Sequence, residues 1–504
     1  FPRKNINAAT LAEVDQIIFT HEQAIEQLDR IRAALSRLQA EIKDPTLLSH
    51  FQDMRSVVDR QLSRHTLERM TPFLQNLDDN TLKAEEKLAL AYSGWVVGPA
   101  LASLDPQTVI QYWHAADTVR ACLRTENPLK RSELAEQLRR TEGVGNEVLT
   151  AIVQLMGPAY ETPNFQPGIP FEVTSLRQVD PPSYQVLLPV EYDLSRSYPV
   201  VLTMHAEGVD PVRELLWWGG NTIAGPAHRR GMIILAPVWP ASQGAGSGAV
   251  HDVALEALQD ACKRFAIDAD RVFLAGHGSG ADAAVDLAMS HPSEFAGLIS
   301  ICGRLNDFAH QYWENCELLP SYFVCGELDG GTINQNAGDW SRMMKYGQDM
   351  HIVQYIQRGQ EDYREELPNI LDWMELHTRS APPQELERTT MRAGDNRFDW
   401  LEFSGLPSTV LEPQTTSSGR TIPARAMPIS GTITGGNNIY LKVGASHVTL
   451  WLSPEIVSFE KRLEVRWKGR TMYNDIPERD PRTMLEHLYL TGDRRRLYWM
   501  RIDI

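Results

Sequence analysis

The residues with the clearest potential for chemistry form the pentapeptide Gly276-His277-Gly278-Ser279-Gly280. A serine in a tight turn can act as a nucleophile in acyl transfer when a base activates its hydroxyl. A turn that presents such a nucleophile holds its central residue in a strained conformation, with small residues two positions before and after it. With Gly276 and Gly280 as these small residues, the central residue is Gly278. Ser279 lies one position too late, and the residue two before it would be the large His277.

The segments on either side of the pentapeptide are predicted to be a strand and a helix. Residues 272–275 form a short apolar run, typical of a parallel strand that is covered on both faces. Small and apolar residues then recur at helical spacing, and a His-Pro pair at 291–292 ends the pattern. The pentapeptide is therefore a strand-to-helix turn. A glycine at its centre tolerates the strained backbone but supplies no attacking oxygen.

Length and composition bound what the chain can be. Its 504 residues are 42% hydrophobic and 23% charged, which is typical of a soluble globular protein of up to three domains. A net charge of −16 argues against nucleic acid as a partner, and no apolar run is long enough to predict a membrane span. The five cysteines are scattered and odd in number, which predicts buried free thiols, no metal site and no cofactor. Unpaired cysteines favour the cytoplasm, although a chain that starts at Phe1 leaves a processed or exported form open.

Residues 1–160 are predicted to form an all-α domain that starts with a long helical hairpin. Apolar residues follow one another in steps of mainly three and four along the first helix, at Leu11, Val14, Ile18, Ile25, Leu28, Leu35, Leu38 and Ile42. Asp44-Pro45 ends this helix, and a second one spans 47–62. The favoured interpretation is that the seam packs on the second helix, and the alternative is self-association as a coiled coil. Further helices are predicted at 82–104, 106–123, 131–140 and 146–156.

Residues 161–384 are predicted to form an α/β domain, and residues 385–504 a small β-rich domain of sandwich type. One or two entry strands at 171–188 precede strands at 198–204, 231–237, 272–275, 297–302, 322–325 and 351–356, which alternate with helices such as 251–265. This alternation predicts a doubly wound, mostly parallel sheet with sites at the carboxyl ends of its strands. In the last domain, strands are predicted at 439–443, 448–452 and 463–467. Trp400, Trp451 and Trp499 are predicted to be core residues, with a ligand platform as the alternative.

Residues 185–378 resemble the α/β-hydrolase superfamily, in particular bacterial predicted peptidases and esterases related to prolyl oligopeptidase-like and polyhydroxybutyrate depolymerase-like enzymes. The stretches that carry the resemblance are 198–208, 236–239, 265–292, 326–329 and 357–374. A weaker similarity extends to long bacterial members with an N-terminal helical region and a C-terminal β domain. The resemblance implies an α/β-hydrolase fold with a Ser-Asp-His triad in that chain order.

Transferred position by position, the triad that the resemblance implies is incomplete. The nucleophile position is Gly278. The acid position is Asp329, at the end of a G-x-x-D stretch, and its structural alternative is a loop-capping aspartate. The base position is Gln360, which can donate and accept hydrogen bonds but cannot take a proton near neutral pH. The chain therefore lacks both the attacking group and the group that activates it.

The oxyanion loop of the family also differs here. Members commonly show H-G-x-G after the first parallel strand, and this chain has His205-Ala206-Glu207-Gly208. The Glu207 carboxylate would bring negative charge to a place where an oxyanion needs stabilising. His205 and His277, near the predicted strand ends, and His351 and His377, on either side of the segment with Gln360, are interpreted as structural.

The leading hypothesis is a catalytically inactive α/β-hydrolase-like protein, a pseudoenzyme with a structural, assembly or ligand-binding role. The first alternative is an active serine esterase or peptidase that uses Ser279 with an unrecognised base. The second alternative is a protein that binds a carbohydrate or peptide partner in the old substrate cleft, because Trp217, Trp218 and Trp239 fall near expected strand-end loops.

Overall fold

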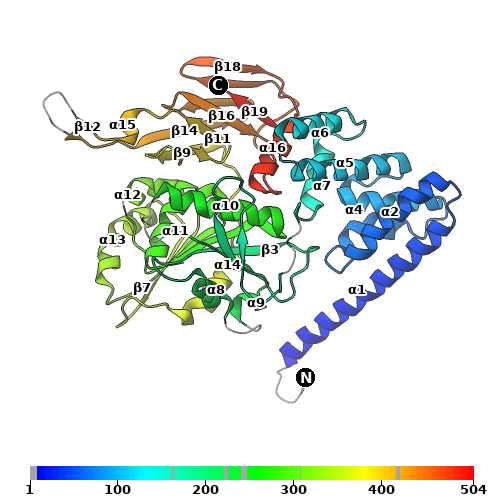
Figure 1. The fold of residues 1–504 in the computed structure, drawn as a ribbon, viewed down its shortest axis with the longest axis horizontal. Helices are drawn as coiled ribbons and strands as arrows, with labels where there is room; N and C mark the ends of the chain where they lie inside the picture. The colour runs from blue at the N-terminus through cyan, green and yellow to red at the C-terminus, as the bar shows by residue number, and fades with distance from the viewer. Residues whose placement is uncertain are drawn as a thin grey trace. The chain divides into compact units, whose positions relative to one another are not determined.

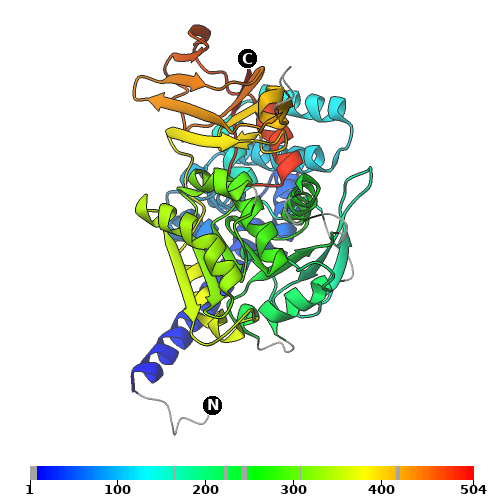
Figure 2. The same ribbon diagram turned by 90° about the vertical axis from the view of Figure 1, so that its left-hand side faces the viewer.

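The computed structural model describes residues 8–160, 162, 165–220, 225–239, 244, 247–306, 308–415 and 421–504 (Figures 1 and 2). The chain divides into two compact units. The first comprises residues 1–159 with the short segment 193–196, and the second comprises residues 160–192 and 197–504. No helix in the described part of the chain combines the length and the apolar character needed to cross a bilayer.

The first unit is built from helices: α1 (Ala8–Ala40), α2 (Pro45–Gln61), η2 (Leu67–Met70), α3 (Thr71–Asn76), α4 (Ala84–Val97), η3 (Pro99–Leu101), α5 (Pro106–Arg124), α6 (Pro128–Arg140) and α7 (Asn146–Leu155). Asp44 caps α2 by accepting hydrogen bonds from two backbone N–H groups, which explains why the hairpin turns where the sequence predicted. Every residue of α4 from Lys87 to Val97 is buried, so this helix is the core of the unit. The helix predicted at 82–104 ends at Val97, because Gly98 adopts a φ of +79°.

The apolar seam of α1 is buried along only half of the helix. From Ile31 onward the seam is buried against α2 and α4, and Leu35 is 0% exposed. Toward the N-terminus, Val14, Ile18 and Ile25 are between 39% and 48% exposed. The prediction that the seam packs on the second helix therefore holds for the second half of α1 alone. The side chain of Leu11, the first residue of the predicted seam, is outside the part of the chain that the structure describes.

The second unit contains an eight-stranded sheet in the order β1-β2-β4-β3-β5-β6-β7-β8. Strands β3 to β8 run parallel, while β1 and β2 are antiparallel to their neighbours. The predicted mixed α/β class with a large, mostly parallel sheet is confirmed. Its strands are β1 (Phe171–Thr174), β2 (Ser183–Leu187), β3 (Tyr198–Met204), β4 (Ile233–Pro237), β5 (Ile267–His277), β6 (Gly297–Ile301), β7 (Ser321–Gly326) and β8 (Met350–Tyr355).

Helices cover both faces of this sheet. Alternate residues of β3 belong to two different apolar clusters. On one face, Leu202 belongs to a cluster with residues of α10 (Gly248–Arg264), α11 (Ser279–Ser290), α12 (Ala309–Tyr312) and α13 (Gly330–Lys345). Val201 packs with residues of α8 (Pro211–Gly219), α9 (Pro226–Arg229) and α14 (Leu367–Glu375) on the opposite face. Because successive side chains of a strand point to opposite faces, each face has its own core. Figure 1 shows α8 and α11 on either side of the strands.

From residue 385 onward the second unit consists mainly of strands. One sheet has the order β10-β11-β16-β19 and the other β18-β17-β15-β14-β9. Trp400 packs against Gly431 of the other sheet, where an added Cβ would collide with the indole ring. Trp400, Trp451 and Trp499 are all buried, so the core interpretation of these side chains is right and the platform alternative is wrong. The strands are β9 (Glu385–Thr390), β10 (Arg397–Phe398), β11 (Leu401–Ser404), β14 (Met427–Thr434), β15 (Asn438–Lys442), β16 (His447–Leu452), β17 (Leu463–Trp467), β18 (Arg470–Asp475) and β19 (Met500–Asp503), with the short strands β12 (Gln414–Thr415) and β13 (Thr421–Ile422) and the helices α15 (Ser408–Leu411) and α16 (Pro481–Thr491).

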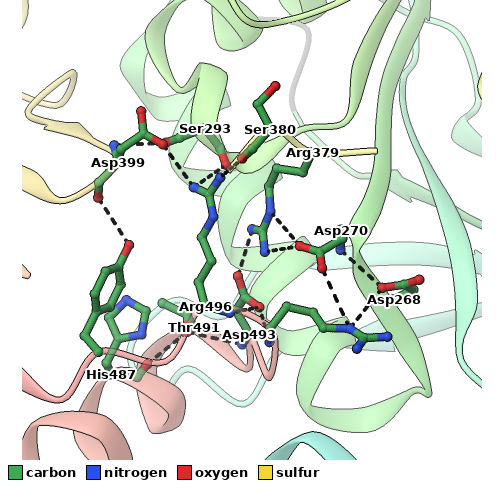
Figure 3. A network of polar contacts seen from close by, with 12 residues as sticks. Asp268, Asp270, Ser293, Arg379, Ser380, Asp399, His487, Thr491, Asp493 and Arg496 are labelled. Atoms are coloured by element: carbon green, nitrogen blue, oxygen red, sulfur yellow. Dashed lines mark hydrogen bonds and ion pairs between the residues drawn. The ribbon is translucent and has the colours of Figure 1, made fainter. Parts of the chain in front are cut away.

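A network of ion pairs joins the α/β part to the strand-rich part (Figure 3). Arg379 lies with one side-chain nitrogen 2.8 Å from Asp493 and another 2.9 Å from Asp270 of β5. Arg495 adds a 3.2 Å contact to Asp268 on the same strand. The Arg379 side chain is only 3% exposed, so its charge depends on these partners. The two parts are therefore held together by buried polar contacts as well as by apolar packing.

Candidate functional site

The turn between β5 and α11 has the geometry that a presented nucleophile would need. Gly278 adopts φ +53° and ψ −121°, close to the values of about +60° and −120° at the first central residue of a type II′ turn. An added Cβ on Gly276 would collide with the carbonyl of Gly280, and one on Gly280 would collide with the end of β3. Both glycines are thus required by close backbone approach. Gly278, midway between them, is the apex of the turn.

The structure brings Gly278 and Gln360 together. A Cβ built on Gly278 would lie 3.3 Å from Nε2 of Gln360. Gln360 follows β8, so the two positions come from the carboxyl ends of two parallel strands of the same sheet. A serine at the apex would therefore direct its hydroxyl toward the Gln360 side chain. With glycine and glutamine in these positions, the pair contains neither a nucleophile nor a base.

Asp329 lies at the carboxyl end of β7 and caps α13. Its Oδ1 accepts a hydrogen bond from the backbone N–H of Thr332 at 3.5 Å, and its buried Oδ2 has no hydrogen-bond partner among the described residues. The neighbouring Leu328 donates its backbone N–H to Arg358 O at 2.8 Å. The loops that carry Asp329 and Gln360 are therefore joined by main-chain contacts. The capping role that the sequence offered as the structural alternative for Asp329 is present.

A buried thiol lies between these two loops. Cys302, at the end of β6, has its Sγ 3.6 Å from the carbonyl oxygen of Glu361. Burial raises the pKa of Cys302 to about 11, and the Asp329 carboxylate raises it as well. Such a thiol is protonated at neutral pH and is a poor nucleophile. The predicted buried free thiols are confirmed for all five cysteines.

The Ser279 hydroxyl is engaged with the loop after β3. Its Oγ accepts a hydrogen bond from the backbone N–H of Glu207 at 2.9 Å. A donor on this loop is one of the two that would hold an oxyanion in the resembling enzymes. No imidazole of the described residues lies within hydrogen-bond distance of Ser279 Oγ. The Ser279 hydroxyl is thus bonded to the loop after β3, and the Glu207 side chain itself is exposed.

A carboxylate–imidazole pair that sequence inspection missed lies next to the apex. His277 Nδ1 is 2.9 Å from Oε2 of Glu214, a buried residue of α8 that also accepts a hydrogen bond from Thr203. The ring packs edge-on against Trp217, with centroids 4.5 Å apart. His277 Nε2 is buried and bonds to no described residue, so no nucleophile faces this pair. The only sequence signal was a glutamate in a helix that is apolar apart from it and the adjacent Arg213.

The remaining histidines and tryptophans singled out from the sequence all contact neighbouring groups, and all except the exposed His351 are buried or partly buried. His205 is buried, and its ring lies 4.9 Å from that of Trp239. His351 stacks on Tyr322, and His377 is 2.7 Å from the carbonyl of Trp373. Trp217, Trp218 and Trp239 are 7%, 0% and 3% exposed. These tryptophans present no surface to a ligand, so the carbohydrate- or peptide-binding alternative loses the feature that motivated it.

One group of side chains in the described part of the chain has metal-ligand geometry. Ligand atoms of His251, His291 and Asp395 all lie within 4.8 Å of one another. The Arg392 guanidinium is 2.7 Å from Asp395 and 2.7 Å from Asp286, so these carboxylates already face a fixed cation. The donor set therefore fits an internal ion-pair network better than a metal centre, and we assign no metal to it.

Comparisons with known proteins return similar structures and no sequence family. No family model matches the chain, and no curated protein does. Among solved structures, a thermostable esterase is 18% identical with a TM-score of 0.36, over 42% of this chain and 63% of that one. S-formylglutathione hydrolase from Staphylococcus aureus is 14% identical with a TM-score of 0.34, over 42% and 98%. A ferulic acid esterase is 16% identical with a TM-score of 0.36, over 42% and 98%.

Proposed function

We propose that this chain is an α/β-hydrolase-like protein without hydrolase activity, and that its α/β part has a structural, assembly or ligand-binding role. The observation that carries this proposal is the apex of the β5–α11 turn, where Gly278 faces Gln360. Acyl transfer by a serine hydrolase needs an oxygen nucleophile and a base within hydrogen-bond reach of each other. The side chain of Gly278 is a single hydrogen atom and that of Gln360 is an amide, so neither can act as the nucleophile or the base.

The engagement of Ser279 supports the same proposal. Its hydroxyl accepts the Glu207 N–H, so the side chain that could have replaced the nucleophile blocks a donor that would stabilise an oxyanion. The His277 imidazole, which Glu214 orients, has no hydroxyl within hydrogen-bond distance of Nε2 among the described residues. An active esterase or peptidase that uses Ser279 would need both contacts to be rearranged.

The test is an assay of the full chain with p-nitrophenyl acyl esters and a fluorophosphonate probe. We expect no covalent labelling and no ester turnover above that of the Ser279→Ala variant. This variant is the matched control, because it removes the only hydroxyl within the pentapeptide. Robust labelling at Ser279, or turnover that disappears in Ser279→Ala, would overturn the proposal and establish the active serine hydrolase instead.

A further inference from the structure

The helical unit contains a cavity of about 230 Å³ that none of the preceding functions uses. Residues of α2, α4, α5 and the end of α7 line it, together with Arg69 of η2. The lining combines two indoles, Trp95 and Trp113, with apolar side chains such as Ile152. Small-molecule sites are characteristically apolar cavities with a few polar groups that fix the orientation of the ligand. This cavity lies entirely within the first unit.

The Arg69 guanidinium in this cavity has no counter-ion in the described part of the chain. Among the described residues, no carboxylate lies within ion-pair distance of it and no hydrogen bond from its side chain is present. Burial lowers the pKa of Arg69 to about 10, and no acidic group raises it. The Arg69 side chain is partly buried, and a cation in such surroundings is normally paired with a counter-ion. The group is thus available to an anion that enters from outside.

The guanidinium is held in place by its surroundings. It lies 5.2 Å from the centroid of the Trp95 ring, in cation–π geometry. The carbonyl of Arg69 lies so close to Gly94 of α4 that any Cβ there would collide with it. Trp113 is fixed as well, since its indole N–H donates to the carbonyl of Tyr92 at 3.1 Å. Arginine and indoles are therefore oriented before any ligand arrives, which reduces the entropic cost of binding.

The other charged groups around the cavity do not neutralise Arg69. Arg120 lies 3.1 Å from Asp117, and the latter side chain is 71% exposed. Asp53 is exposed. The His50 and His114 rings contact each other edge to face, with centroids 5.8 Å apart. These paired and exposed groups form the rim of the cavity, and among the described residues none of them is a counter-ion of Arg69.

We propose that this cavity binds a small organic monocarboxylate with a flat, apolar body. The carboxylate contacts the Arg69 fork, and the body packs against Trp95 and Trp113. Guanidinium groups bind carboxylates through two parallel hydrogen bonds, which a neutral amide cannot reproduce. A volume of about 230 Å³ lies below the range of about 300–1,000 Å³ for drug-sized ligands, so the ligand is of the size of an aryl carboxylate. This inference is independent of the hydrolase-like site.

The test uses the full chain and 4-fluorobenzoate, titrated by ¹⁹F NMR and by calorimetry. We expect saturable binding at one site per chain and at least tenfold weaker binding of 4-fluorobenzamide. Arg69→Gln is expected to weaken 4-fluorobenzoate binding at least tenfold, whereas Arg120→Gln, the matched control at the rim, changes it less than threefold. Arg69→Lys, which keeps the charge and loses the fork, is expected to fall between them.

Circular dichroism of each variant checks that the helical unit remains folded. If Arg69→Gln does not fold, the decisive measurement is the nuclear Overhauser contact between the probe and the Trp95 and Trp113 indoles in the unmodified chain. No saturable binding of 4-fluorobenzoate at 10 mM, on the order of the weakest specific affinities, would overturn the proposal. Equal affinity for acid and amide, or binding without contacts to either indole, would overturn it as well.

Discussion

Placing a serine and a histidine at positions 278 and 360 is the most direct test of the proposal that the β5–α11 turn lacks a nucleophile and a base. The change is the double variant Gly278→Ser/Gln360→His. A Cβ at position 278 would lie 3.3 Å from the Gln360 amide nitrogen, so a serine hydroxyl there is within hydrogen-bond reach of a histidine at 360. The close neighbour is the end of a flexible side chain, which can shift. A serine at 278 therefore needs a shift of a few tenths of an ångström in the side chain at 360, and we expect a histidine there to make this shift.

The cost of the rebuilt pair is backbone strain at position 278. A non-glycine residue at φ +53° is expected to cost about 1–3 kcal/mol. In a domain of 150–250 residues this corresponds to a fall in the unfolding midpoint of about 2–4 °C per kcal/mol, and to less in a larger unit. We expect the double variant to fold with a midpoint lowered by a few degrees, measured by differential scanning calorimetry.

We expect the double variant to react covalently at residue 278. Removing the serine or histidine of a triad costs about 10⁶ in kcat in a well-studied protease, so restoring both is expected to produce fluorophosphonate labelling where none existed. In the double variant the Ser279 hydroxyl still accepts the hydrogen bond of the Glu207 N–H. Loss of one oxyanion donor lowers kcat by about 10²–10³-fold in enzymes of this kind. Adding Ser279→Ala should therefore raise the labelling rate further, by about 10²-fold.

The matched control is Gly278→Ala/Gln360→His, which carries the same backbone strain and no hydroxyl. Labelling is expected at residue 278 of the serine variant and at no residue of the control. If the serine variant folds but is labelled no faster than the alanine control, positions 278 and 360 do not form the nucleophile and base positions, and the reasoning is refuted.

Three further predictions concern stability and assembly. Arg379→Met should destabilise the second unit by about 3–5 kcal/mol in urea unfolding, because it removes the ion-pair partner of the buried Asp493 carboxylate. The control Arg501→Met, which breaks an exposed ion pair, should cost less than about 1 kcal/mol. Equal effects of the two variants would show that the network does not stabilise the fold. Burial by itself would raise the pKa of Asp493, but the Arg379 charge more than offsets it, so this pKa lies below its ordinary value. The resulting stabilisation is complete above the unfolded-state pKa of about 4 and is lost as the pH falls below it, and Asp493→Asn should flatten that part of the urea-midpoint profile between pH 5 and 2. A second copy of the chain is expected to cover the exposed seam of α1 as a coiled coil, so light scattering should show a dimer. Ile18→Lys/Ile25→Lys should convert this dimer to a monomer, whereas Ile17→Lys, which lies off the seam, should leave it unchanged. A monomeric unmodified chain would contradict this prediction.

The sequence carried enough information for the local elements and for the position of the turn. Apolar runs and helical spacing predicted β5 and α11 because both patterns depend on residues close together in the chain. The spacing of Gly276 and Gly280 identified Gly278 as the apex, and the structure shows the backbone contacts that require both glycines. The absence of a hydroxyl at the apex followed from the sequence alone, since it depends only on residue type.

The tertiary structure decided which distant residues meet. That Gln360 faces Gly278 depends on the parallel pairing of β5 through β8, which places the carboxyl ends of these strands on one edge. The bond between Ser279 and Glu207 and the pair of His277 with Glu214 join segments separated by 72 and 63 residues, and no local pattern indicates either contact. The half-buried seam of α1 and the placement of Arg69 beside Trp95, with no counter-ion among the described residues, depend in the same way on packing between helices. The sequence by itself determines residue types and local structure. Ion pairs, burial and the meeting of two residues in one site depend on tertiary structure, because they form only when the folded backbone brings remote segments into contact.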